Sequence, residues 1–258
     1  MRPHRALSMA LAAFAFVAAS LSGVPASHAA AETYVALGDS YSSGTGAGNY
    51  TNVLCTRSAN AYPQRWAAAN SPAVFRFVAC GGAKIPDVRG NQLSALDGST
   101  TLVSITIGGN DVGFADTMLS CLLSSTTACR NAVNRGLEYA RNVLPGELDA
   151  LYAEIRARAP QAKVVVLGYP RLYKQGGICL GGPSSTKRSI INDGADRLNE
   201  VIADRAAAAG FTFADARQAF AGHEICTSSP WISGTTVHPN ATGHARGYLP
   251  ALSAALAP

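Results

Sequence analysis

The chain has 258 residues, of which 48% are hydrophobic and 14% are charged, and its formal net charge is +5. That charge is small and its basic residues are scattered, which argues against a nucleic-acid partner. No stretch after residue 31 is apolar for long enough to predict a transmembrane helix, which argues against an integral membrane protein.

Residues 1–31 have the pattern of a secretory signal peptide. Arg2 and Arg5 form a basic start, an apolar core (MALAAFAFVAASL) follows, and small residues offer cleavage sites after Ala29 or Ala31. The alternative, a retained membrane anchor, fits less well because the core is short for a bilayer. Without Arg2 and Arg5 the chain has 19 basic and 16 acidic residues, a net charge of +3. We therefore expect a secreted, extracellular protein with one domain over residues 32–258.

Five apolar runs in the remaining chain predict β-strands. Each run is short, and most are rich in valine, isoleucine or phenylalanine. Residues with useful chemistry, such as Asp, Ser, Asn and Gly, follow several of these runs directly. The runs are YVALGD (34–39), VFRFVA (74–79), LVSITIGG (102–109), KVVVLGYP (163–170) and FTFADA (211–216).

Helical stretches separate these strands. Residues 58–70 have Pro63 early and alanines after it, and apolar residues recur at helical spacing in residues 144–160 and 184–210, the second of which closes at Gly210. Alternating strands and helices predict a parallel sheet that is covered on both faces. We expect a three-layer α/β/α sandwich with a flavodoxin-like, five-stranded sheet in the order 2-1-3-4-5. In such sheets ligands bind at the carboxyl ends of the strands.

The glycine-rich turn after the first strand admits two interpretations. A strand that ends in GDSYSSGTGAG could cradle a phosphate, or it could present Ser40 as a nucleophile. The phosphate interpretation fails because Asn49 stands where a dinucleotide motif needs its third glycine, and because no Walker lysine follows. The second strand also lacks an acidic residue that could hold a ribose. The pattern therefore favours Ser40 as a nucleophile.

A serine nucleophile needs donors for the oxyanion and a general base. Gly82 in ACGGA follows the second strand and Asn110 in TIGGND follows the third, so either could donate to an oxyanion. Each alone is an ordinary turn residue, but three strand ends with suitable groups favour a site. The base would be His238, on a loop before a C-terminal helix. His223 is more typical of a loop residue, and His244 is expected to pack or to face solvent.

These motifs together resemble the SGNH, or GDSL, hydrolase family, and the chain is most similar to its secreted actinobacterial lipases and phospholipase A1 enzymes. GDSYS, the glycine of CGGA, GGND and HPNATGH occur in the family's order, and the likeness covers the mature chain. The resemblance implies the SGNH fold, with Ser40 as the nucleophile and His238 as the base. It also implies an oxyanion hole from the backbone N–H groups of Ser40 and Gly82 and the side chain of Asn110.

The resemblance further implies extracellular hydrolysis of carboxylic esters through an acyl-enzyme, with no metal and no cofactor. A lipase or lipolytic esterase is the leading interpretation, followed by a phospholipase A1 and a carbohydrate acetylesterase. A non-catalytic surface-binding protein is the alternative from a different class. We expect an ester or lipid substrate, transient contact with lipid interfaces, no nucleic acid, and a monomer.

The sequence departs from the family pattern before the histidine. Many members have an Asp three residues before it, and here that position is Thr235. The nearest preceding acids are Glu224 and Asp215. Some secreted actinobacterial members use a main-chain carbonyl instead, so we expect a Ser40–His238 dyad whose ring is oriented by the carbonyl of Thr236, or of Thr235.

The six cysteines, an even number in an exported chain, predict disulfides and not a metal site, because no Cys-x-x-Cys pair occurs. Six cysteines allow 15 pairings, so counting alone does not give the connectivity. The family resemblance implies Cys55–Cys80, Cys121–Cys129 and Cys179–Cys226.

Overall fold

The structure is a computed structural model that describes residues 32–257. The predicted signal peptide and its cleavage sites lie outside these residues. Among the described residues, no helix is long and apolar enough to cross a membrane.

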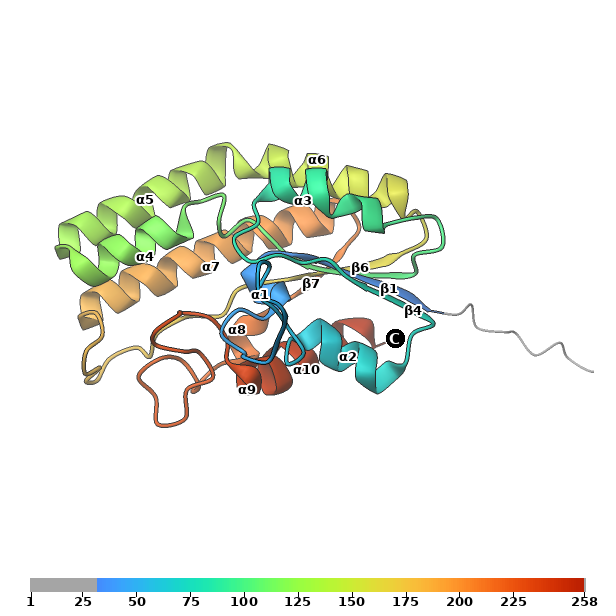
Figure 1. The fold of residues 1–258 in the computed structure, drawn as a ribbon. Coiled ribbons are helices and arrows are strands. Elements are labelled where there is room, and N and C mark those ends of the chain that lie inside the picture. Colours follow the sequence, from blue (N-terminus) through green and yellow to red (C-terminus); the bar gives the residue numbers. More distant parts are fainter. Residues whose placement is uncertain (1–31, 258) are drawn as a thin grey trace, which may run out of the picture. The chain divides into compact units, whose positions relative to one another are not determined.

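A five-stranded parallel sheet forms the centre of the fold, in the order β4-β1-β5-β6-β7 (Figure 1). Counted along the chain, this is the predicted order 2-1-3-4-5. Both central strands, β1 and β5, are buried along their whole length, as expected of a sheet covered on both faces. The strands are β1 (Thr33–Gly38), β4 (Val74–Phe77), β5 (Leu102–Thr106), β6 (Lys163–Leu167) and β7 (Thr212–Ala214).

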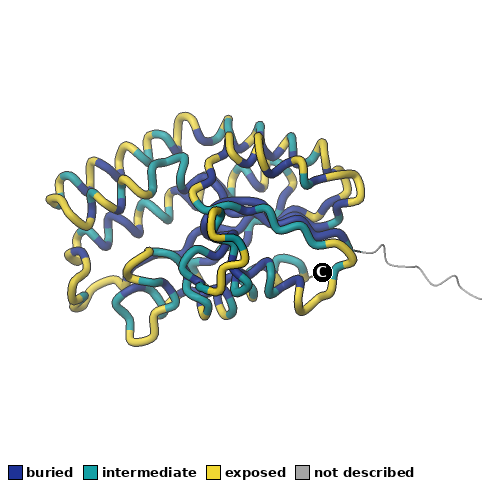
Figure 2. Tube along the Cα trace, in the orientation of Figure 1, coloured by how far each residue is buried: buried dark blue, intermediate teal, exposed yellow. Residues whose placement is uncertain are grey.

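Helices cover both faces of the sheet, which completes the predicted α/β/α sandwich (Figures 1 and 2). One face carries α3 (Ile85–Asn91), α4 (Phe114–Leu123), α5 (Thr126–Asn142), α6 (Leu144–Arg158) and α7 (Ser185–Ala208). The other face carries α2 (Tyr62–Asn70), α8 (Ala216–Ala219), α9 (Ala241–Gly243) and α10 (Leu249–Leu256). Short elements complete the described chain: α1 (Ser40–Ser43), a two-stranded ribbon of β2 (Tyr50–Asn52) and β3 (Arg57–Ser58), a 3₁₀ turn (Leu93–Ala95) and a π-helical turn (His244–Tyr248).

The predicted helical stretches correspond to α2, α6 and α7, whereas α4 and α5 were not predicted. The signal for α5 was present in the sequence, because its buried residues Cys129, Ala132, Val133 and Ala140 recur at helical spacing. In α4, by contrast, apolar residues occur both among the buried and among the exposed positions, so the helical period is hidden. These two helices build one wall of the cleft described below.

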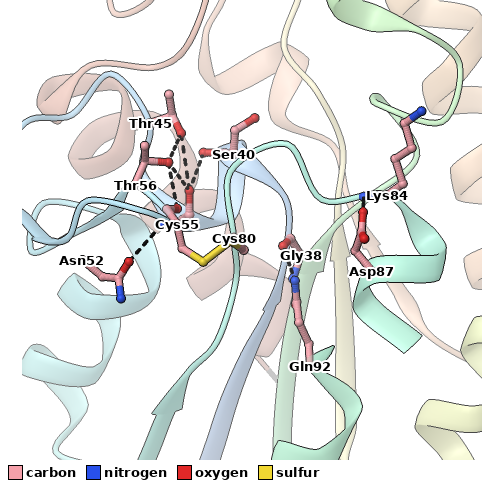
Figure 3. Close-up of a disulfide and its surroundings, with 11 residues drawn as sticks. Gly38, Ser40, Thr45, Asn52, Cys55, Thr56, Cys80, Lys84, Asp87 and Gln92 are labelled. Carbon is pink, nitrogen blue, oxygen red and sulfur yellow. Dashed lines mark hydrogen bonds between the residues drawn. A yellow bond between two sulfur atoms is a disulfide. The ribbon is translucent and has the colours of Figure 1, made fainter. Parts of the chain in front are cut away.

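Three disulfides are present, and they join the pairs that the resemblance implied: Cys55–Cys80, Cys121–Cys129 and Cys179–Cys226. The first lies beside the turn that carries Ser40 (Figure 3). It brings the Cys55 carbonyl to the N–H of Gly81, at 2.9 Å. The loop after β2 is thereby fastened to the turn that contains Gly82.

Candidate active site

A constrained backbone turn places Ser40 at the carboxyl end of β1. Gly38 has a φ of +120°, and a Cβ at this position would overlap the Thr106 carbonyl, so only glycine fits. The Gln92 side chain accepts from the Gly38 N–H at 2.7 Å and donates to the Gly38 carbonyl at 2.9 Å (Figure 3). The Asp39 side chain then caps α1 by accepting from the Tyr41 N–H at 2.9 Å. As a result Ser40 is the first residue of α1, in a fixed orientation.

His238 contacts Ser40 directly. Its Nε2 lies 2.8 Å from the Ser40 Oγ, and its Nδ1 lies 2.5 Å from the carbonyl oxygen of Thr236. A carbonyl can only accept a hydrogen bond, so Nδ1 carries the proton and Nε2 is free to accept from the serine hydroxyl. Burial lowers the pKa of His238, and the Thr236 bond, which raises it, does not compensate. The imidazole is therefore neutral at pH 7, as a general base must be.

The loop that carries His238 is fastened to α1, the helix that begins with Ser40. Val237, the residue before it, has a left-handed backbone conformation with φ +54°. The Tyr41 hydroxyl, one residue after Ser40, donates to the Val237 carbonyl at 2.7 Å. Ser233 accepts the Val237 N–H through its own carbonyl and donates its N–H to the His238 carbonyl, both at 2.9 Å. These bonds hold a strained backbone in place, as is frequent at functional sites.

No carboxylate within residues 32–257 bonds to the His238 ring. Asp215 caps α8 and pairs with Arg217 instead. Burial raises the pKa of Asp215, but the Arg217 hydrogen bonds outweigh it and the pKa lies below its usual range. The backbone carbonyl of Glu224 accepts hydrogen bonds from the hydroxyl and the N–H of Thr227. The ring is oriented by a main-chain carbonyl, which is the arrangement expected from the Thr235 substitution.

The expected oxyanion donors lie at the ends of three adjacent strands. Asn110 donates one side-chain N–H to the Ala83 carbonyl at 3.0 Å, which ties it to the turn of Gly82 and leaves its second N–H available. Gly82 has a φ of +79°. Within residues 32–257, neither the Ser40 N–H nor the Gly82 N–H donates to another group. Each can therefore donate to a substrate oxygen.

A buried polar network behind Ser40 was not predicted from the sequence. The Asp39 carboxylate accepts from the Thr106 hydroxyl at 2.6 Å and from the Tyr169 hydroxyl at 2.5 Å. Tyr169 in turn accepts the Gly109 N–H at 3.0 Å, next to Asn110. Burial raises the pKa of Asp39 to about 6, although its hydrogen bonds lower it. The network connects the turn of Ser40 with the turn of Asn110. In the sequence, Asp39, directly before Ser40, was the one residue that pointed to it.

The two other histidines of the described chain lie elsewhere. His223 stacks on Trp231 with 3.6 Å between ring centroids, and its Nδ1 lies 2.8 Å from the Ser229 carbonyl. His244 is fully buried and accepts the Tyr62 N–H at 3.3 Å. Burial lowers the pKa of His244 to about 3, so it stays neutral. Of the three histidines in residues 32–257, His238 alone contacts Ser40, as expected from the sequence.

An apolar cleft with a cavity volume of about 80 Å³ leads away from Ser40 and Asn110. Its walls come from α4, α5 and α7, and they are almost entirely nonpolar. An apolar cleft with a few polar groups at one end is typical of a site for an apolar ligand. The wall residues include Phe114, Met118, Val133, Leu137, Ala140, Leu172, Ile191, Ala195 and Leu198.

An α/β/α sheet with a hydrogen-bonded serine and neutral histidine at its carboxyl edge has the architecture of a serine hydrolase. Residues 36–246 match the model of the GDSL-like lipase/acylhydrolase family. The chain belongs to this family, and it is a serine ester hydrolase of the lipase and esterase class.

Several characterised proteins are similar over most of their length. Lipase 1 of Streptomyces coelicolor is 50% identical over 257 residues, covering 96% of both chains, and a lipase of Streptomyces rimosus is 48% identical, covering 96% of this chain and 94% of its own. Among solved structures, the extracellular lipase of S. rimosus has a TM-score of 0.85 at 49% identity, covering 87% of this chain and all of its own. Phospholipase A1 of Streptomyces albidoflavus NA297 has a TM-score of 0.84 at 51% identity, covering 87% and 99%. An acetylxylan esterase of Geobacillus stearothermophilus, at 16% identity and a TM-score of 0.54, shares the fold alone.

Proposed function

We propose that the protein is a secreted lipase that cleaves esters of extended acyl chains through a Ser40–His238 dyad. The observation that carries this proposal is the position of the serine–histidine pair at one end of an apolar cleft. Such a cleft would hold an acyl chain, and burial of each methylene would stabilise the complex by about 0.8 kcal/mol. A carbohydrate acetylesterase would gain little from it.

In the proposed reaction the Ser40 Oγ attacks the ester carbonyl while the His238 Nε2 takes the hydroxyl proton. The oxyanion that forms would accept from the Ser40 and Gly82 N–H groups and from Asn110. His238 then gives its proton to the departing alcohol, which leaves an acyl-enzyme. A water molecule, deprotonated by the same nitrogen, attacks the acyl-enzyme carbonyl, and the fatty acid leaves as His238 returns this proton to the Ser40 Oγ. One oxyanion donor of this kind typically stabilises the transition state by roughly 3 kcal/mol.

The Thr236 carbonyl performs part of the role of an Asp in a triad. It fixes the tautomer and the orientation of the ring, but it offers a dipole where a carboxylate would offer a full charge to the imidazolium. The low exposure of the site partly offsets this difference, because a dipole acts more strongly where water is excluded.

Export is the second part of the proposal. The pattern of residues 1–31, the three disulfides and the extracellular lipase of S. rimosus support it. Phospholipase A1 activity is the second candidate function, favoured by the 51% identity to the S. albidoflavus enzyme. Both candidates use the same dyad and cleft and differ in the head group of the substrate.

Reaction with a serine-directed phosphonate, followed by peptide mapping, tests the nucleophile. We expect one label, on Ser40, and none in the Ser40→Ala variant. A label on a different serine with Ser40 unmodified would contradict the proposal. Release of fatty acid from triacylglycerols and from phospholipids, measured side by side, then distinguishes the two candidate functions.

A further inference from the structure

Five large apolar side chains are exposed at one end of the molecule. They lie on two segments, the end of α4 and the loop of residues 174–183, both of which are mostly exposed (Figure 2). Both segments lie at the end of the molecule where α7 begins: residues 174–183 lead into α7, and the Lys187 Nζ in its first turn donates to the Ser124 carbonyl, just after α4, at 2.5 Å (Figure 1). We call them the tip surface; its members, with their exposed fractions, are Leu119 (58%), Leu122 (42%), Leu123 (77%), Ile178 (83%) and Leu180 (94%).

Helix α4 carries apolar residues at both its buried and its exposed positions. Met118 and Cys121 are buried, and Met118 lines the acyl cleft. Leu119, Leu122 and Leu123 point away from the core and have no cover in the structure. A helix that is apolar on both faces is typical of an environment that is apolar on both sides. The exposed leucines of α4, the helix whose buried side lines the cleft, therefore have no packing partner among the described residues.

A disulfide and four hydrogen bonds hold the loop that carries Ile178 and Leu180. Cys179 lies between these two residues and is joined to Cys226. Arg188, only 2% exposed, donates to four carbonyls of the loop and so fixes its course. The two apolar side chains therefore stand on a supported loop. The four acceptors are the carbonyls of Lys174, Gly176, Gly177 and Pro183, at distances of 2.7–3.1 Å.

The segments that form the tip surface carry basic residues and no acidic ones, although Asp193 of α7 lies in one groove with Arg130. Residues 117–137 and 173–192 contain no Asp and no Glu, and their basic residues are Arg130, Arg135, Lys174, Lys187 and Arg188. Apolar side chains flanked by cations are the pattern of a protein that lies on an anionic lipid surface.

We propose that the tip surface binds anionic lipid surfaces and seats the α4 wall of the acyl cleft at the lipid. The five apolar side chains enter the interface, and the exposed basic residues beside them, Arg130 and Lys174, face the anionic head groups, whereas the buried Arg188 only supports the loop. The biological use of this binding rests on the proposed lipase function, but the binding itself is measurable without turnover.

The experiment measures partition of the purified protein onto vesicles, in a Ser40→Ala background so that the lipid stays intact. Two variants alter the tip surface: Leu122→Ser with Leu123→Ser, and Ile178→Ser with Leu180→Ser. The matched control is Val53→Ser with Leu54→Ser, at residues that are 76% and 95% exposed but lie outside the tip surface. Vesicles of phosphatidylglycerol are compared with vesicles of phosphatidylcholine. Each variant pair is also assayed with Ser40 intact on p-nitrophenyl acetate, a soluble ester.

We expect the unaltered surface to bind phosphatidylglycerol more tightly than phosphatidylcholine. Each tip variant should lower the partition constant about tenfold or more, with the control unchanged. Arg130→Gln with Lys174→Gln should weaken binding to phosphatidylglycerol alone. Turnover of p-nitrophenyl acetate should be the same in all variants, which separates this proposal from the identity of the nucleophile.

Equal binding to both lipids, or an equal loss from the Val53 and Leu54 control, would overturn the proposal by assigning binding to general apolar exposure. Undiminished partition of both tip variants would overturn it as well. A lipid-free dimer that the tip variants dissociate, seen by sedimentation, would assign the surface to self-association and would also overturn it.

Discussion

His238 presents an unprotonated Nε2 to Ser40 because the Thr236 carbonyl holds the proton on Nδ1. Only the neutral ring can take the serine proton, and burial lowers the pKa of the ring. We therefore expect kcat/KM for a soluble ester to rise with pH through one step with a midpoint below 6.5, and then to stay level through neutral pH. The same step should persist in the Asp39→Asn variant, which separates it from titration of that carboxyl. A midpoint above 6.5 would mean that a charged partner stabilises the imidazolium.

Asp39 should make stability depend on pH in a direction unusual for an acid. Its folded pKa, about 6, lies above the unfolded value of 3.8, so the folded state favours the protonated form. Its favourable contribution is complete below pH 3.8 and is lost as the pH rises through 6. Relative to Asp39→Asn, we expect the native unfolding free energy to fall by up to about 3 kcal/mol between acid and pH 8. Urea unfolding of both proteins across this range measures it, and parallel pH profiles would contradict it.

At the scale of elements, the strands and the helices α2, α6 and α7 could be predicted because each has a clear period or a continuous apolar run. Helix α4 could not, because its apolar residues lie at both buried and exposed positions, whereas α5 has apolar residues at helical spacing and could have been predicted. Their omission also hid the acyl cleft, whose wall they form with α7. Ser40, Gly82, Asn110 and His238 were visible as candidates because each follows a strand or lies on a late loop. The Asp39–Tyr169 contact joins residues 130 apart in sequence, so no local pattern announced it.

The cleft formed by these helices should select for acyl chain length. Ala195 of α7 lines it, and Ala195→Leu would fill part of its volume. We expect kcat/KM for p-nitrophenyl palmitate to fall about tenfold or more, since lost methylene contacts each contribute about 0.8 kcal/mol, with the acetate ester unaffected. Ala203→Leu, on the same helix but away from the cleft lining, is the matched control. An equal loss on both esters would indicate damage to the dyad and would count against an acyl-binding role.

In the molecule as a whole, Cys55–Cys80 and Cys179–Cys226 fasten loops, whereas Cys121–Cys129 joins α4 to α5 within the core. In the chain-entropy model, the 47-residue span of Cys179–Cys226 contributes about 4 kcal/mol and the 8-residue span of Cys121–Cys129 about 2.5 kcal/mol. We expect the Cys179→Ser, Cys226→Ser protein to lose more unfolding free energy than the Cys121→Ser, Cys129→Ser protein, by denaturant unfolding. The reverse order would show that native-state contacts outweigh loop closure. The connectivity itself came from the family resemblance, because counting six cysteines left 15 pairings open.

The central claim is that a serine–histidine pair, oriented by a main-chain carbonyl, performs the hydrolysis without an acidic partner. The most direct measurement is kcat on p-nitrophenyl butyrate for His238→Ala, Asp215→Asn and Glu224→Gln, each checked for folding by circular dichroism. We expect a loss of about a thousandfold or more for His238→Ala and less than about tenfold for the two carboxylate variants. A loss of about a thousandfold in a folded Asp215→Asn or Glu224→Gln protein would reveal a triad acid and rule out the dyad.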